Sequence, residues 1–165
     1  MREDFIGRLE KLKEQKVWTR ARAVLRRSLA FDPGAYPPAM PFVEPWVREE
    51  GWVREAHYLV AALYALLDGA HVEGRTLARA LREARERRGS ESLERRFLAL
   101  LDADRDQLPH RLRQAAGLVE GGVDFVQLLR DLRHWFHPDR WVQARWAREF
   151  YGAQVSDEER KEVEA

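Results

Sequence analysis

The chain has 165 residues, a net charge of +1 and no cysteine, and 45% of its residues are hydrophobic. This length fits one domain with a hydrophobic core of its own. The lack of cysteine excludes disulfides, thiolate metal ligands and thiol catalysis. No apolar run approaches the roughly 20 residues that span a bilayer, and the charged N-terminus lacks the apolar core of a signal peptide. We therefore expect a cytoplasmic protein with a single helical domain over residues 1–165.

The charges are unevenly distributed along the chain. The last ten residues, SDEERKEVEA, carry five acids and two bases. We expect this acidic tail (156–165) to be flexible, and the rest of the chain is net positive. Of the 29 basic residues, 25 are arginine and four are lysine. The planar guanidinium group suits contacts with phosphate and stacking on bases, although a GC-rich genome or a thermophilic host also favours arginine.

The spacing of apolar residues predicts two helices before a proline-rich connector. An apolar stripe from Phe5 to Leu12 predicts the first helix. A second helix follows Trp18, with Thr19 as its expected N-cap. Residues 31–45 hold five of the seven prolines and are expected to form an irregular connector.

Helices are predicted through the rest of the chain as well. Pro45 fits the first turn of the next helix, and residues 56–67 are apolar nearly all round, which is typical of a central buried helix. Gly89 ends a later helix, and Asp124 with Gln127 makes a capping-box-like start. The further predicted helices are 75–88, 91–103, 108–119, 124–135 and 139–151. No strand-like alternation is found, so we expect an all-α fold, a compact bundle of about seven or eight helices with a proline-rich connector.

No catalytic or metal-binding motif is found. His134 and His137 are three residues apart but lack a third ligand of suitable spacing. The carboxylates Asp102, Asp104 and Asp106 lack the glycine and terminal glutamate of a calcium loop, and a solvated turn between helices is the simpler interpretation. We expect no metal or other cofactor and no enzymatic activity. A nuclease that uses this carboxylate cluster is the remaining enzymatic alternative.

The tripeptide His137-Pro138-Asp139 is found in J-domain co-chaperones, where it engages a chaperone ATPase from the loop of a helical hairpin. Here it lies near the C-terminus, and the helix before it has a core of different spacing. A helical protein-interaction module, or a J-domain-like co-chaperone, therefore stays open as the alternative function.

Arginine faces on three predicted helices are better candidates for a functional surface. In residues 20–28, Arg26 and Arg27 lie near the edges of the apolar stripe, because each residue advances ~100° around a helix. The helix after the Asp124 cap carries Arg130 and Arg133 opposite its apolar stripe, on a face without acid.

In the last helix, Trp141, Arg145 and Arg148 share a face. A face that interleaves arginine with tryptophan can bind phosphate and stack a base. The alternative for all three faces is a solvated rim whose arginines pair with acids elsewhere.

Several pieces of the sequence, taken in their order and spacing, resemble the CasB family. Proteins of this family are the small subunits of type I-E CRISPR Cascade surveillance complexes. The pieces are RFLALL (96–101), LPHRLRQAAGLV (108–119), DFVQLLRDLRHW (124–135) and ARWAREFYG (144–152), with ARAVLRRSLA (21–30) near the N-terminus.

The resemblance implies a helical bundle without enzymatic activity, present as a pair of copies along a complex that carries crRNA. Its basic surfaces would hold the displaced strand, or flank the crRNA–target duplex, and so stabilise the R-loop in antiviral defence. The expected partners are other Cascade subunits, a second copy of the chain, crRNA and target DNA, with no membrane and no small-molecule substrate.

The resemblance also transfers positions for the contacts with nucleic acid. Arg96 and Arg113 lie beside apolar stripes and could instead be internal salt-bridge partners. The candidate nucleic-acid-binding residues are Arg26, Arg27, Arg130, Arg133, Arg145 and Arg148.

Overall fold

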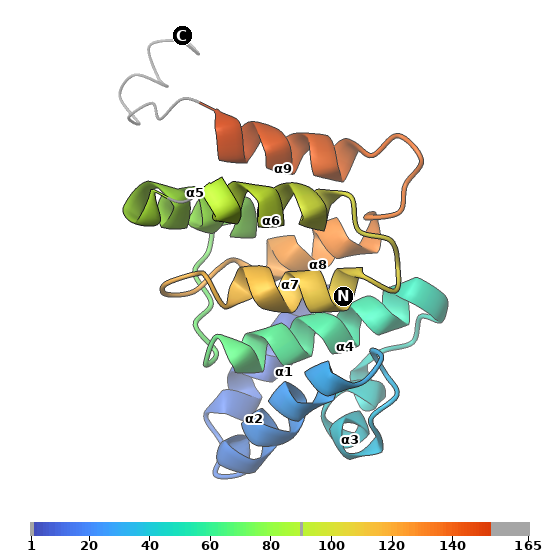
Figure 1. Ribbon diagram of the computed structural model, residues 1–165. Coiled ribbons are helices and arrows are strands. Elements are labelled where there is room, and N and C mark those ends of the chain that lie inside the picture. Colours follow the sequence, from blue (N-terminus) through green and yellow to red (C-terminus); the bar gives the residue numbers. More distant parts are fainter. Residues whose placement is uncertain (1, 90, 153–165) are drawn as a thin grey trace, which may run out of the picture.

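The computed structural model describes residues 2–89 and 91–152, and these residues form nine α-helices (Figure 1). The helices are α1 (Arg2–Lys13), α2 (Trp18–Arg27), α3 (Met40–Val43), α4 (Gly51–Leu66), α5 (Leu77–Arg88), α6 (Glu91–Leu101), α7 (Leu108–Ala116), α8 (Phe125–Arg133) and α9 (Trp141–Tyr151). Within these residues the only β-like contact is one isolated bridge between His71 and Val123. The all-α prediction is confirmed. The tail predicted to be flexible (156–165) lies outside the described residues.

Helix α4 lies at the centre of the fold. Its residues from Ala56 to Ala65 are all buried, as expected for a helix that is apolar on every side. It packs against α2 and α8, and more lightly against α7 and α3. Figure 1 shows α2 and α3 on one side of α4, and α7, α8, then α5, α6 and α9 on the other, while α1 runs behind α4 and packs on α8. No helix in the described ranges is long and apolar enough to cross a membrane.

The buried histidine of α4 is satisfied by its own helix. His57 is 3% exposed, and its Nδ1 lies 2.7 Å from the carbonyl oxygen of Val53. The hydroxyl of the next residue, Tyr58, donates a hydrogen bond to Glu44, and burial raises the pKa of that hydroxyl. Both side chains therefore belong to the core.

Two predicted helix starts are wrong. Helix α2 begins at Trp18 and its N-cap is Val17, which makes no side-chain capping bond, so Thr19 lies inside the helix. Pro45 lies in a separate 3-10 helix (Glu44–Trp46), and α4 begins only at Gly51. Proline fits the first turn of a 3-10 helix as well as that of an α-helix, because the N–H that it lacks has no partner there in any case.

The proline-rich connector is more regular than predicted. It contains a 3-10 helix at Pro37–Ala39, the short helix α3 and the 3-10 helix that holds Pro45. Ala39 and Val43 are buried against the core, so apolar packing holds these short turns in place. Helix α3 accounts for the ninth helix, where seven or eight were expected.

Of the capping box predicted at the start of α8, the structure contains the Asp124 cap but not the return bond from Gln127. The Asp124 carboxylate accepts a hydrogen bond from the Gln127 N–H at 3.0 Å, which confirms the N-cap. The Gln127 amide does not return to the cap but donates to Asp131 at 2.9 Å. Gly89 ends α5 in the left-handed conformation, as predicted.

The loop before α8 is fastened to the loop after α4. The Val72 N–H donates to the Val123 carbonyl at 2.9 Å, and the Val123 N–H donates to the Ala70 carbonyl at 3.2 Å. The backbones approach so closely that a Cβ on Gly122 would lie 1.7 Å from the Ala70 carbonyl oxygen. Only glycine fits there without a shift of the backbone.

We expect Gly122→Ala to destabilise the protein by about 1–3 kcal/mol, because the two loops must separate to admit the methyl group. Urea denaturation measures this change in the free energy of unfolding. Gly117→Ala is the matched control, since its Cβ would meet its nearest neighbour at an ordinary 3.5 Å. Equal stability of the two variants would contradict the close approach.

A buried carboxylate joins α8 to α9. Asp131 is 2% exposed and accepts hydrogen bonds from the Trp146 indole at 2.8 Å and from the Gln127 amide at 2.9 Å. It also forms an ion pair with Arg145, which lies 3.5 Å from Glu149 one turn further along α9. Because a buried charge without a partner is costly, Arg145 is needed for the fold.

Asp131→Ala should therefore cost about 3–5 kcal/mol of folding free energy, as it breaks a buried pair and leaves donors unsatisfied. Asp131→Asn should cost less, because an acceptor for the Trp146 indole remains. Arg148→Ala, at an exposed position of α9, should change stability very little. Thermal melting of the three variants tests this order, and an Asp131→Ala variant as stable as Arg148→Ala would refute it.

Candidate nucleic-acid interface

The six predicted arginines differ in how their charges are used. Arg26 and Arg27 occupy the last turn of α2 and are exposed. Neither forms an ion pair with any residue of the described ranges. Their charges are therefore available to a ligand, as the sequence suggested.

Arg133 is held by an acid from a distant part of the chain. Its Nη1 lies 3.1 Å from a carboxylate oxygen of Glu49, and its side chain is only 16% exposed. Burial alone would raise the pKa of the Glu49 carboxyl, but hydrogen bonds from backbone amides and from Arg133 hold that pKa below its ordinary value. The exposed face of α8 itself carries no acid beside Arg133, but the fold brings Glu49 to it from the loop before α4.

Arg145 is also engaged within the protein. It pairs with Asp131 and Glu149, and its guanidinium carbon lies 5.9 Å from the centroid of the Trp141 ring. The predicted sharing of a face by Trp141 and Arg145 is confirmed. Two carboxylates nevertheless compensate the charge of this arginine.

The remaining two predicted arginines lie on other parts of the surface. Arg130 on α8 and Arg148 on α9 are both exposed. In Figure 1, α9 and α2 lie at opposite ends of the molecule, with α8 behind α7. The structure therefore does not bring the six arginines into one site.

Two arginines that the sequence suggested as salt-bridge partners prove to be exposed. Arg96 on α6 and Arg113 on α7 point to solvent, as does Arg95. None of the three forms an ion pair within residues 2–89 and 91–152. The interpretation of Arg96 and Arg113 as internal partners is wrong, because each adjoins a buried residue in sequence but lies on the outer side of its helix.

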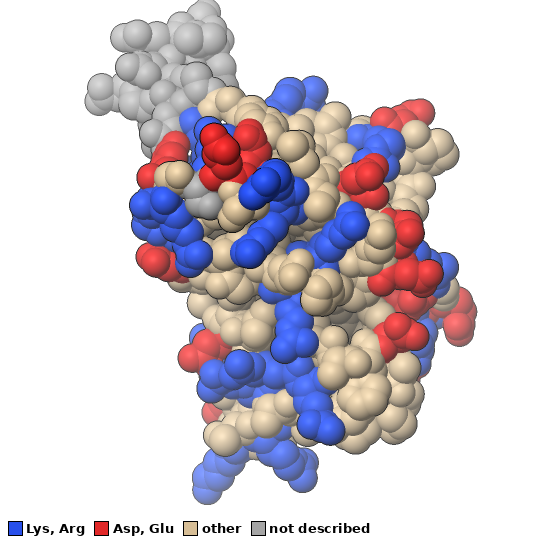
Figure 2. Space-filling model, in the orientation of Figure 1, with Lys and Arg blue, Asp and Glu red and all other residues tan. Residues whose placement is uncertain are grey.

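These exposed arginines lie on neighbouring elements. Helix α6 packs on α7, and α7 contacts the 3-10 helix Ser28–Ala30 that directly follows α2. We refer to the set as the basic band: Arg26, Arg27, Arg95, Arg96 and Arg113. Figure 2 shows Lys and Arg side chains running over this face from α6 across α7 to α2, while Asp and Glu gather mainly at its edges.

The difference between paired and unpaired arginines decides what the surface can bind. An arginine that already contacts a carboxylate adds little net field and must give up that contact to meet a phosphate. An exposed arginine without an acid partner keeps its full charge, and binding to phosphate releases counterions from the nucleic acid. The basic band is therefore the strongest candidate for a phosphate-binding surface.

The His137-Pro138-Asp139 tripeptide forms a tight turn between α8 and α9. His137 Nδ1 accepts the Asp139 N–H at 3.1 Å, and the Arg140 N–H donates to the His137 carbonyl at 2.9 Å. Arg140 has a φ of 53° and donates to the Leu101 carbonyl at 2.6 Å. The tripeptide thus has a structural role that sets the direction of α9.

The carboxylates proposed as a solvated turn are exposed, as expected. Asp104 accepts the Gln107 N–H at 2.9 Å, and the Gln107 side chain accepts the Asp104 N–H at 3.2 Å, so these two bonds close the turn that precedes α7. No group of three or more His, Asp or Glu residues in the described part of the chain is arranged to hold a metal ion.

Comparison with known proteins identifies the family. The model of the family described as CRISPR-associated protein Cse2 matches residues 21–151. The CRISPR-associated protein Cse2 of Thermus thermophilus is 65% identical, covering 99% of this chain and 98% of that protein. The crystal structure of CasB from Thermus thermophilus superposes with a TM-score of 0.86 at 63% identity, covering 92% of this chain and 98% of that chain.

A more distant similar chain was solved as part of a larger complex. A chain of a CRISPR RNA-guided surveillance complex matches with a TM-score of 0.72 at 25% identity, covering 91% of each chain. The resemblance that the ordered sequence pieces indicated is confirmed, and a J-domain origin of the tripeptide is set aside. The chain belongs to the Cse2 family of CRISPR-associated proteins, whose members are also named CasB.

Proposed function

We propose that the chain is the non-catalytic small subunit of a type I-E CRISPR Cascade surveillance complex and that it binds nucleic acid to stabilise the R-loop. A relative of the same fold has been solved as part of a CRISPR RNA-guided surveillance complex, which supports the assembly. The partners in this proposal are other Cascade subunits, a second copy of the chain, crRNA and target DNA.

The observation that carries the proposal is the basic band. It consists of exposed arginines from three helices that neighbour one another, and none of them has an acid partner in the described residues. Such a surface follows a phosphate backbone without reading its sequence. We therefore expect binding to the displaced strand, or beside the crRNA–target duplex, without base preference from these arginines.

The other predicted arginines take different parts in this proposal. Arg130 and Arg148 are exposed and offer a second, separate contact with phosphate. Arg133 and Arg145 contribute mainly by holding α8 against the loop before α4 and against α9. Changing them to acids would therefore disturb the fold before it revealed any contact with nucleic acid.

A modest surface charge suffices for such a function. In guided DNA recognition the heteroduplex that forms is about as stable as the duplex that it replaces, so protein contacts with the backbone shift a nearly balanced exchange. Each phosphate contact adds roughly 0.7–0.9 to the slope of log affinity against log salt concentration. A few arginines of the basic band can therefore change R-loop lifetime measurably.

The test compares two variants with the same loss of charge in the assembled complex. Arg26→Gln with Arg27→Gln removes two unpaired arginines. Arg87→Gln with Arg105→Gln removes two exposed arginines that pair with Glu120 and Glu55. We expect the first pair to shorten the R-loop lifetime severalfold and to lower the salt slope by about 1 to 2, and the second pair to change both much less.

Filter binding or single-molecule measurement of R-loops at several salt concentrations provides the readout, after the subunit composition of each complex has been verified. If both pairs of substitutions reduce R-loop lifetime equally, the effect is one of net charge and the basic band has no special role. If neither does so, the chain does not hold nucleic acid through α2.

A further inference from the structure

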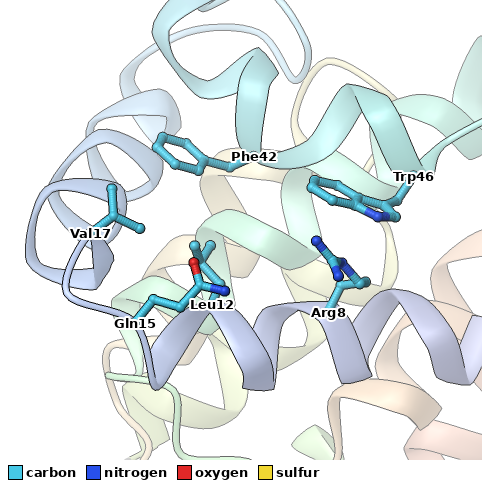
Figure 3. Close-up of a pocket in the computed structure, with 6 residues that line it drawn as sticks. All are labelled: Arg8, Leu12, Gln15, Val17, Phe42 and Trp46. Carbon is cyan, nitrogen blue, oxygen red and sulfur yellow. The ribbon is translucent and has the colours of Figure 1, made fainter.

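A hollow of about 170 Å³ opens between α1 and the proline-rich connector (Figure 3). Its lining residues are Arg8, Leu12, Gln15, Val17, Phe42 and Trp46. Figure 3 shows Phe42 and Trp46 extending from the connector toward α1, with the side chains of α1 opposite them. Trp46 is 40% exposed, which is unusual for the largest apolar side chain, and the hollow lies beside it.

The two aromatic rings are held by their surroundings. The guanidinium carbon of Arg8 lies 4.3 Å from the centroid of the Trp46 ring, so the charge rests on the indole face. Phe42 is partly buried against the core, and Leu12 provides an apolar floor between α1 and the connector. Gln15 is exposed at the edge of the hollow, and its amide makes no hydrogen bond to a residue of the described ranges.

Basic residues accompany the lining of the hollow along the chain. Residues 11–20 contain four bases and one acid. Lys11, Lys16 and Arg20 are exposed and form no ion pair within the described part of the chain. Lys16 lies between two residues that line the hollow, Gln15 and Val17. A ligand that is both ring-shaped and anionic therefore complements the hollow better than a purely apolar one.

We propose that this hollow receives an unpaired base of a single-stranded nucleic acid. The base stacks on the aromatic surface formed by Trp46 with Arg8, the Gln15 amide meets the base edge, and Lys11 and Lys16 contact the flanking phosphates. Aromatic rings beside a cationic groove bind single strands in this way, because every base has a face that can stack. A duplex keeps its bases stacked, so the hollow selects for single strands.

This inference rests on the proposed function and deepens it, because the basic band alone does not distinguish a single strand from a duplex. The experiment compares three ligands of equal length: a single-stranded thymidine oligonucleotide, the same strand with abasic sites, and a duplex. Trp46→Leu removes the stacking ring and Trp46→Phe retains an aromatic one. Phe136→Leu is the matched control, since Phe136 is 41% exposed and lies on the turn before α9.

We expect Trp46→Leu to weaken binding of the base-bearing single strand about fivefold or more, with Trp46→Phe and Phe136→Leu close to the unchanged protein. The affinity for the abasic strand and for the duplex should be the same in all four proteins. A strand that carries 5-bromouracil should crosslink on irradiation to the peptide that contains Trp46, in the purified chain and in the assembled complex. Thermal melting verifies that each variant folds.

The outcomes separate this inference from the proposed function. If the unchanged protein and its complex bind none of the three ligands, the proposed function fails and this inference fails with it. If they bind base-bearing and abasic strands equally well, and Trp46→Leu has no effect, only the stacking site is overturned. A crosslink of Trp46 to another protein subunit, in place of the strand, would also overturn it.

Discussion

The stretch of α4 from Ala56 to Ala65 is apolar nearly all round, and this property constrains the helices that cover it. Its residues are all buried, so neighbours must cover it all round. Each covering helix turns an apolar stripe inward and leaves its charged residues on the outside. With 35% charged residues in the chain, the outer surface is inevitably rich in arginine and glutamate. Whether a given arginine can bind a ligand then depends on which acids the neighbouring elements bring to it.

Arg113 and Arg133 show that residues of neighbouring elements determine whether an arginine is free to bind a ligand. Each follows a buried leucine on an amphipathic helix, and sequence spacing alone does not separate them. Arg133 meets Glu49 from the loop before α4, whereas Arg113 faces solvent. Arg145 is even less available to a ligand, because it supplies the counter-charge for the buried carboxylate of Asp131. The arginines of the basic band are therefore available for binding, while Arg133 of α8 and Arg145 of α9 hold the fold together.

Local signals in the sequence predicted most of the helices. The apolar run of α4, the apolar periodicity of α8, the Asp124 cap and the helix end at Gly89 all depend on residues within one or two turns of each other. The family was also predictable, because it depends on several ordered pieces spread over the chain. Helix α3 was missed because proline within a short segment predicts a break, and only packing of Val43 on the core makes the segment helical. The pairing of Glu49 with a residue of α8 was missed because it joins positions 84 residues apart, and no periodicity predicts such a contact.

The central claim is that arginines without acid partners hold the nucleic acid, and arginine-specific chemical footprinting tests it most directly. The assembled complex is treated with phenylglyoxal in the absence and presence of a bound target, and each arginine is quantified by mass spectrometry. We expect the target to protect Arg26, Arg27, Arg96 and Arg113 from reaction, and Arg145 to react slowly in both states. Protection that is confined to arginines outside the basic band, or no protection on this chain, would contradict the claim.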